Sequence, residues 1–288
     1  MDPLGLVHLT PLMQVTSGRP EIKLALIDGP VVISHPDLVS DHIQEIPGSL
    51  RGSCARASST ACIHGTFVAG ILSGRRGSSA PALCPNCTLL VRPIFVETTS
   101  RNGLMPSAKP ADVAAAMIDC IDAGAHIINL SVALAQPSSH GEREFGSALD
   151  YAARRGVIVV AAAGNQGTLG SSAITRHPWV IPVASCDLHG RPTAYSNLGG
   201  SIGKRGLSAP GESITSLGTA GKPHTLSGTS MAAPFVTGAM ALLWSASPTA
   251  TAAEVKLAAV PTHTVHRTTV VPPLLNAWAA YQTLRYRQ

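Results

Sequence analysis

The chain has 288 residues, of which 45% are hydrophobic, and it carries a formal net charge of +5 at pH 7. This length and apolar content allow a large buried core, and we expect a single domain over residues 1–288. The lysines and arginines are scattered and are not interleaved with aromatic residues, so the charge predicts no nucleic-acid partner. No apolar run approaches the roughly 20 residues that span a bilayer, so no membrane association is expected.

The N-terminal residues Met1, Asp2 and Pro3 do not begin a basic stretch that leads into an apolar run. A secretory signal would need both features, so we expect a soluble, cytoplasmic protein. A signal or pro-segment that had been removed would leave no trace in this sequence.

Apolar runs rich in β-branched residues alternate with helical patterns along the chain. In chain order we expect strand 22–27, helix 64–72, strand 88–95, helix 110–123, strand 127–132, helix 145–155, strands 157–163 and 180–184, and helices 230–245, 252–260 and 274–285. This alternation is typical of βαβ units and predicts an α/β fold with a parallel sheet. Because parallel crossovers are right-handed, the carboxyl ends of the strands gather at one edge, where loops build a site.

Three reactive side chains stand at the edges of these apolar elements. Asp28 ends the first strand, His64 opens the following helix, and Ser230 stands where a loop becomes the long helix 230–245. Nucleophilic serine catalysis needs a hydroxyl, an imidazole that takes its proton and a carboxylate that orients the imidazole. The chain order Asp, His, Ser separates this set from other serine hydrolases, and Ser230 is not in the GxSxG motif of the α/β-hydrolases.

A fourth polar group, Asn165, follows the buried strand 157–163. Its side-chain amide can donate to an oxyanion, and such a donor is typically worth ~3 kcal/mol of transition-state stabilisation. The backbone N–H of Ser230 at the start of its helix is the expected second donor, favoured by the helix dipole. Each of the four residue types is also common at its place as a turn former or helix cap. Only their joint occurrence, in this order, favours catalysis.

The sequence at this point resembles the subtilase family of serine proteases, over about residues 22–280. The family's His motif is matched by residues 64–70, its Asn motif by residues 162–165, and its Ser motif by Gly-Thr-Ser-Met-Ala-Ala-Pro at residues 228–234. The resemblance implies a three-layer fold with a seven-stranded, mostly parallel sheet between helices. It assigns the nucleophile, base, orienting acid and oxyanion donor to Ser230, His64, Asp28 and Asn165. It also implies a substrate strand that lies along Ser131, Val132, Ala133 and Gly164.

Short motifs point to one branch of this family. Asp28 is followed by Gly-Pro-Val at residues 29–31, and Pro-Ile-Phe occurs at residues 93–95. These variants are similar to the cyanobactin maturation proteases, which trim ribosomally made precursor peptides. Macrocyclising relatives carry extra helices between the Asp and His segments, whereas here a short Ser/Gly-rich stretch joins them. We therefore expect hydrolysis rather than transamidation.

The resulting hypothesis is a serine endopeptidase that processes a precursor peptide as a monomer, without a cofactor. Residues 74–82, where relatives bind calcium, offer Arg75, Arg76 and small side chains instead of carboxylates, so no metal is expected. Two alternatives remain: an exported degradative protease, which would digest casein broadly, and a pseudoenzyme that binds peptides without cleaving them.

The chain contains six cysteines. Two pairs are close enough in sequence to close short loops, and they predict two disulfides: Cys54 with Cys62, and Cys84 with Cys87. Cys120 and Cys186 lie in apolar segments and are expected to be buried free thiols. A zinc site would need a second CxxC or a histidine pair, and a redox-active CxxC should open a helix, whereas this one precedes a strand. Neither is favoured.

Overall fold

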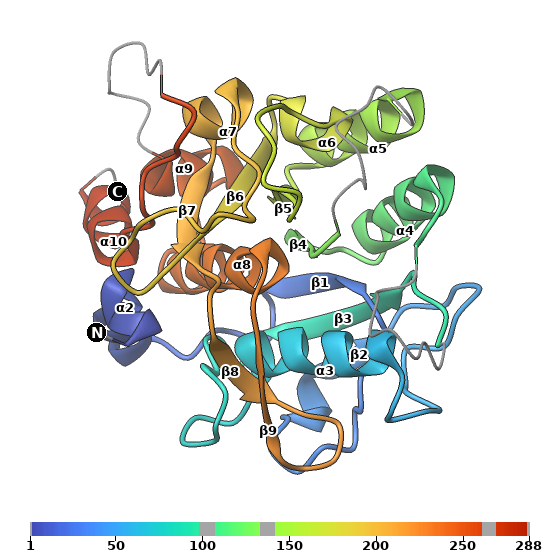
Figure 1. Ribbon diagram of the computed structural model, residues 1–288. Helices are drawn as coiled ribbons and strands as arrows, with labels where there is room; N and C mark the ends of the chain where they lie inside the picture. The colour runs from blue at the N-terminus through green and yellow to red at the C-terminus, as the bar shows by residue number, and fades with distance from the viewer. Residues whose placement is uncertain (1, 98–106, 133–141, 261–268, 287–288) are drawn as a thin grey trace.

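The computed structural model describes residues 2–97, 107–132, 142–260 and 269–286. They form three layers, in which a seven-stranded sheet of order β2-β3-β1-β4-β5-β6-β7 lies between helices (Figure 1). Every neighbouring pair in this sheet is parallel. The α/β fold expected from the sequence is confirmed.

The strands of the main sheet are short and almost completely buried, apart from β2 at its edge. They are β1 (Lys23–Asp28), β2 (Ile43–Glu45), β3 (Thr88–Pro93), β4 (Ile127–Leu130), β5 (Ile158–Ala162), β6 (Val180–Cys186) and β7 (Leu207–Pro210). A separate antiparallel hairpin consists of β8 (Ile214–Leu217) and β9 (Pro223–Leu226). Strands buried on both faces are near-continuous apolar runs, and this explains why the sequence pattern located most of them.

The helices differ widely in length. They are α1 (Pro3–Leu6), α2 (Leu9–Val15), α3 (Thr60–Ser73), α4 (Pro110–Asp122), α5 (Glu142–Arg155), α6 (Ala173–Arg176), α7 (Gly200–Arg205), α8 (Thr229–Ala246), α9 (Ala252–Ala259) and α10 (Ala277–Arg285). A 3-10 turn covers Ser40–His42. Among the described residues, no helix is long and apolar enough to cross a membrane.

The sheet has a separate core on each face, because successive side chains of a strand point in opposite directions. On β1, Leu24 and Leu26 pack with α3, α8 and the C-terminal helices, whereas Ala25 and Ile27 pack with α4 and α5 (Figure 1). Helix α8 is buried along nearly its whole length. It therefore provides a rigid support in the middle of the molecule.

Two features of the fold differ from the sequence-based expectation. Helix α3 begins at Thr60, because the Oγ of Ser59 accepts a hydrogen bond from Cys62 N at 3.1 Å and caps the helix. His64 therefore lies in the second turn of α3 and does not open it. The N-terminal helices α1 and α2, the edge strand β2 and the short helices α6 and α7 were not expected, whereas β8 and β9 lie in residues 199–228, a loop segment for which short strands were expected.

The prediction of a disulfide between Cys84 and Cys87 is wrong, because both residues are buried free thiols. They lie in the apolar core on the α8 face of the sheet, and the Sγ of Cys87 lies 3.7 Å from Ser245 Oγ of that helix. The two thiols thus act as small core side chains. Cys54 and Cys62 are joined by a disulfide, and Cys120 and Cys186 are buried free thiols. Burial raises the pKa of Cys186 to about 12.

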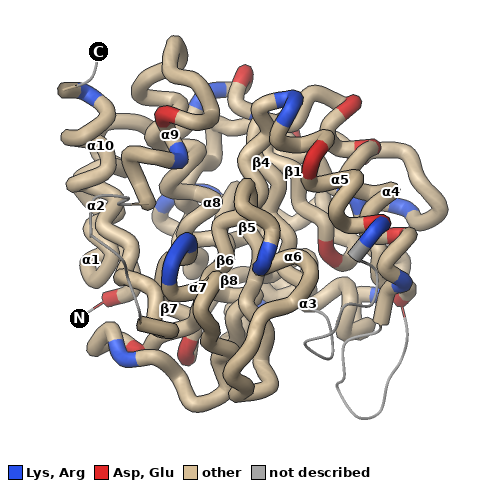
Figure 2. The backbone as a smooth tube through the Cα atoms, turned by 90° about the horizontal axis from the view of Figure 1, so that it is seen from above, with Lys and Arg blue, Asp and Glu red and all other residues tan. Residues whose placement is uncertain are grey.

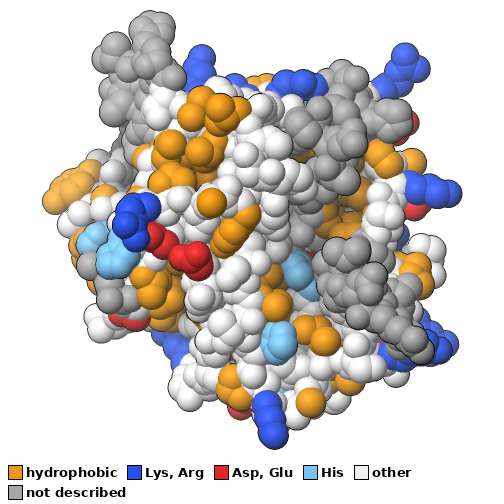
Figure 3. Space-filling view, viewed as in Figure 1, with side chains coloured by type: hydrophobic (Ala, Val, Ile, Leu, Met, Phe, Trp, Pro, Cys, Tyr) orange, Lys and Arg blue, Asp and Glu red, His pale blue; other side chains and the backbone are white. Residues whose placement is uncertain are grey.

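Charged side chains are spread over the surface. In the view of Figure 2 the lysines and arginines are dispersed among acidic residues and do not gather in one patch. On the face shown in Figure 3 the basic side chains lie mainly toward the rim, and histidine side chains reach the surface near the middle. The central part of this face is therefore mostly uncharged.

Candidate active site

The carboxyl end of β1 and the second turn of α3 bring Asp28 and His64 together. Asp28 is completely buried and His64 is 8% exposed. Asp28 Oδ1 lies 2.7 Å from His64 Nδ1 and also accepts the backbone N–H of Gly29 at 2.6 Å. An ionised carboxylate can only accept, so Nδ1 carries the proton in this hydrogen bond. The Nε2 atom of His64 is then left to act as the base.

Glycines allow the close approach that this contact needs. A Cβ on Gly29 would lie 2.0 Å from the carbonyl oxygen of Ala61 on α3. A Cβ on Gly65 would lie 2.4 Å from the carbonyl oxygen of Gly29. The segment after Asp28 and the helix that carries His64 therefore touch backbone to backbone, which fixes the separation of the two side chains.

Two opposing effects act on the imidazole of His64. Burial lowers its pKa, while the negative charge of Asp28 and the hydrogen bond to it raise the pKa; together the last two prevail, so the pKa lies above its ordinary value. The other carboxylate oxygen, Asp28 Oδ2, is buried and has no hydrogen-bond partner among the described residues. The charge of Asp28 is thus directed at a single partner side chain, the imidazole.

Ser230 and Asn165 border one small space beside Gly228, the residue that precedes α8. A Cβ on Gly228 would lie 3.1 Å from Asn165 Nδ2 and 3.2 Å from Ser230 Oγ. Gly228 also has a φ of +153°, a conformation that side-chain-bearing residues rarely adopt. A side chain at position 228 would therefore crowd both the hydroxyl of Ser230 and the amide of Asn165.

The amide of Asn165 is oriented by Thr229, a residue that the sequence analysis missed. Asn165 Oδ1 accepts hydrogen bonds from the N–H of Thr229 at 2.8 Å and from its hydroxyl at 2.9 Å. The Thr229 hydroxyl in turn accepts from Gly164 N at 3.1 Å. With its oxygen engaged in this way, Asn165 presents Nδ2 to the space beside Ser230. The position of Thr229 next to the nucleophile, at a helix start, was the available signal.

The predicted substrate strand begins where β4 ends. Ser131 Oγ accepts from Asn129 Nδ2 at 2.6 Å and donates to the backbone oxygen of Ser230 at 3.4 Å. Asn129 Oδ1 accepts the hydroxyl of Thr237 on α8 at 2.8 Å. This chain of hydrogen bonds ties the strand end to the helix of Ser230. Ala133 lies outside the described residues, and the substrate contacts predicted for Ser131, half-buried Val132 and Gly164 likewise stay predictions.

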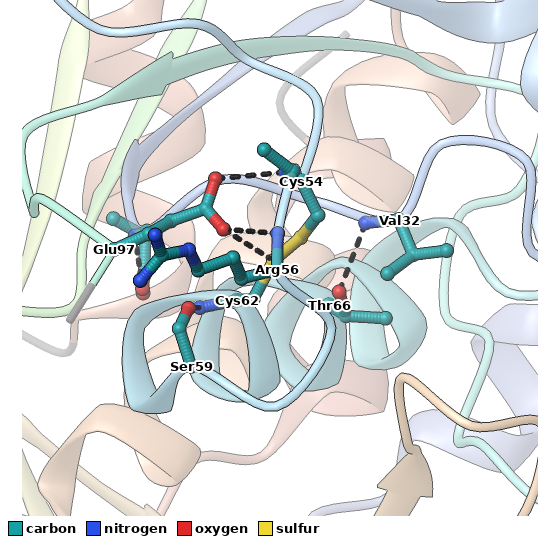
Figure 4. The surroundings of a disulfide bond; sticks show 10 residues. Val32, Cys54, Arg56, Ser59, Cys62, Thr66 and Glu97 are labelled. Atoms are coloured by element: carbon teal, nitrogen blue, oxygen red, sulfur yellow. Dashed lines mark hydrogen bonds between the residues drawn. A yellow bond between two sulfur atoms is a disulfide. The ribbon is translucent and has the colours of Figure 1, made fainter. Parts of the chain in front are cut away.

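A disulfide anchors the first turns of α3 (Figure 4). It joins Cys62, two residues before His64, to Cys54 in the preceding loop. The carboxylate of Glu97 holds the same loop by accepting the N–H groups of Ala55, at 2.8 Å, and Arg56. From the other side, Val32 N donates to Thr66 Oγ1 at 3.0 Å. The helix that carries His64 is therefore fixed at several points.

Within the described residues His64 and Ser230 share no hydrogen bond. Such contacts are often long in substrate-free enzymes and shorten when substrate binds. The described part of the chain also contains no group of three or more His, Cys, Asp or Glu residues that could hold a metal ion.

The subtilase family matches residues 19–276 of the chain. A thermophilic serine proteinase of Bacillus sp. (strain AK1) is 33% identical over 241 residues, which are 80% of this chain and 54% of that protein. The chain thus spans about half the length of this relative.

Two solved structures are similar over nearly the whole fold. The protease domain of PatA, a patellamide maturation protease, has a TM-score of 0.85 and 30% identity, and the match covers 94% of this chain and 98% of that one. The prenylagaramide maturation protease PagA has a TM-score of 0.82 and 28% identity, with 96% and 98% covered. Together with the family match, these similarities show that the chain belongs to the subtilase family.

Proposed function

We propose that this subtilase is a serine endopeptidase in which Ser230 is the nucleophile, His64 the base, Asp28 the orienting acid and Asn165 the oxyanion donor. The observation that carries the proposal is the buried hydrogen bond of 2.7 Å between Asp28 and His64. The shared space of Ser230 and Asn165 beside Gly228 supports it.

The reaction follows from these positions. His64 Nε2 takes the proton of Ser230 as its oxygen attacks the carbonyl carbon of a peptide bond. Negative charge then develops on the carbonyl oxygen, where Asn165 Nδ2 and the backbone N–H at the start of α8 can donate to it. The imidazolium that forms is stabilised by Asp28 and gives its proton to the leaving amine. Water then releases the acyl group from Ser230.

The substrate that we propose is a precursor peptide, and the outcome is hydrolysis. Between β1 and α3 the chain forms only the 3-10 turn at Ser40–His42 and the short strand β2. No additional helix occurs in this described segment to shield an acyl-enzyme from water. The similarity to two maturation proteases over the whole fold supports a processing role.

The first test uses a ribosomal-type precursor peptide with a leader sequence, and its products are identified by mass spectrometry. We expect two linear fragments from the wild-type protein and intact peptide from Ser230→Ala. A mainly cyclic product would contradict hydrolysis. Intact peptide together with failure of a fluorophosphonate to label Ser230 would indicate a peptide-binding pseudoenzyme.

A degradative protease is the second candidate, because the relative from Bacillus sp. (strain AK1) is a thermophilic serine proteinase. Digestion of casein compares the two: broad, rapid digestion favours degradation, and cleavage restricted to one site of the precursor favours processing.

A further inference from the structure

Asn197 lies beneath the loop that carries Asn165. It belongs to the segment between β6 and α7, and it is 7% exposed. Its Oδ1 accepts from Gln166 N at 3.0 Å and from the N–H and hydroxyl of Thr168, both at 3.1 Å. Its Nδ2 donates to Ala163 O at 3.2 Å and to Gln166 Oε1 at 2.6 Å. One buried amide thus binds both sides of Asn165 along the chain.

The orientation of this amide is defined by its partners. Both backbone N–H groups lie at Oδ1, and a backbone carbonyl lies at Nδ2, so exchange of the two atoms would place donor against donor. The backbone of Asn197 adds a hydrogen bond from its N–H to Gly164 O at 2.9 Å. The contacts therefore require an asparagine amide in this orientation.

The loop needs this support because it cannot form a regular ladder of its own. Its backbone has positive φ angles at Gly164, +108°, and at Gly167, +62°. Without the Asn197 side chain, the N–H groups of Gln166 and Thr168 would lose their acceptor. Backbone hydrogen bonds from Gly167 N to Tyr195 O at 2.8 Å and from Leu198 N to Thr168 O at 3.0 Å would still hold the outer part of the loop. The part next to Asn165 would lose its side-chain support, and we expect Asn165 to shift with it.

We propose that Asn197 is a positioning residue for the oxyanion donor: it fixes loop 163–168 so that Asn165 Nδ2 faces the space beside Ser230. Thr229 orients the amide of Asn165, and Asn197 fixes the backbone from which that amide projects. The inference rests on the proposed function, because it takes Asn165 as the oxyanion donor. A displacement of about 1 Å at such a group can cost on the order of 100-fold in rate.

The test compares Asn197→Ala and Asn197→Asp with the wild-type protein on a chromogenic peptide. The concentration of active sites used to calculate kcat is the concentration of protein that a fluorophosphonate labels. Unfolded protein therefore does not lower the measured kcat. We expect kcat to fall about 10- to 100-fold in Asn197→Ala, with KM changed by less than about twofold, because the lost interaction acts in the transition state. Asn197→Asp retains the acceptor but sets an oxygen against Ala163 O, so we expect a loss of kcat here too.

The decisive measurement is a double-mutant cycle. In an Asn165→Ala background, Asn197→Ala should change kcat by less than about twofold, because there is no donor left to position. The matched control is Ser208→Ala in β7, which removes a buried side-chain hydrogen bond of 3.0 Å from Ser208 Oγ to Pro272 O. This change should leave kcat unchanged in both backgrounds.

Two failures can be told apart. Equal losses from Asn197→Ala in both backgrounds, or a loss confined to KM, would overturn the positioning role while Asn165 kept its own. A wild-type kcat in Asn165→Ala would overturn the oxyanion assignment of the proposed function, and the role of Asn197 with it.

Discussion

The two halves of the candidate site are held in different ways. Asp28 and His64 are set by direct backbone contact between the end of β1 and α3, and a disulfide anchors the helix. Ser230 and Asn165 are set by side-chain hydrogen bonds from Thr229 and Asn197 around an irregular loop. The first half is therefore sensitive to added volume and the second to lost polar groups.

The largest expected effect tests whether the two halves act as one unit. Ser230→Ala and His64→Ala should each lower kcat by about a millionfold, a size that comes from subtilisin itself. The double variant should be no slower than either single variant, because each change alone already stops the proton transfer. Single-turnover assays on the chromogenic peptide measure this. Multiplying losses in the double variant would contradict a shared step.

A second change removes the charge from the first half and keeps its shape. Asp28→Asn should lower kcat by about 10⁴-fold, because an amide in this place favours the wrong tautomer of His64. KM should stay close to the wild-type value, since Asp28 is completely buried and does not reach the substrate. Steady-state kinetics measures both constants. A reduction of kcat by less than tenfold would show that other groups orient His64.

Added volume should damage the first half specifically. Gly65→Ala places a Cβ 2.4 Å from a backbone oxygen, and we expect it to reduce the free energy of unfolding by up to about 3 kcal/mol. Gly146→Ala in α5 is the matched control: its Cβ meets nothing within 4 Å, so it should increase stability by about 0.5–1 kcal/mol. Urea denaturation of both variants measures the contrast. Equal effects would show that α3 can move away from Asp28.

Opening the disulfide between Cys54 and Cys62 should weaken the anchor of α3. The bond closes a loop with a sequence separation of 8, so its removal should cost about 2.5 kcal/mol of unfolding free energy. The double variant Cys54→Ala, Cys62→Ala should show this loss in urea denaturation, together with a reduced kcat. Cys120→Ala, a buried cysteine outside any disulfide, controls for the lost sulfur. An unchanged kcat would show that the remaining contacts of α3, among them the hydrogen bond from Val32 N to Thr66 Oγ1, are enough to hold His64 in place.

The smallest effect is a shift along the pH axis. The pKa of His64 is raised, so kcat/KM should increase with pH through a value above that of an ordinary histidine, as the imidazole becomes neutral. The stability from the Asp28–His64⁺ pair has the opposite dependence: it is complete below the ordinary pKa and is lost as pH rises through the raised one. In Asp28→Asn the charge that raises the pKa of His64 is gone and the lowering effect of burial remains. The rise of kcat/KM with pH should therefore occur at lower pH than in the wild-type protein. If this rise occurred at the same pH in both proteins, it would report the titration of a group other than His64.

Much of the site could be predicted because it lies at the ends of strongly patterned elements. Asp28 closes an apolar strand, and the segment around Ser230 is a distinctive motif at the start of a long apolar helix. Asn197 could not be identified in this way, since its importance comes from contacts between segments that are distant in sequence. For Thr229 the only signal was its place beside Ser230, because its hydrogen bonds to Asn165 also join distant segments. Local sequence spacing was also misleading for Cys84 and Cys87, which the core accepts as free thiols. The short helix α1 had a usable signal in Asp2, whose carboxylate accepts from Leu4 N and Gly5 N.

The position of α8 late in the chain has a consequence for biosynthesis. A polypeptide that emerges from the ribosome contains Asp28 and His64 long before the proposed nucleophile is made, and Ser230 reaches its place only when α8 packs against one face of the sheet. A copy whose synthesis stops before residue 230 therefore lacks the proposed nucleophile. Only the completed fold brings the four candidate site residues together.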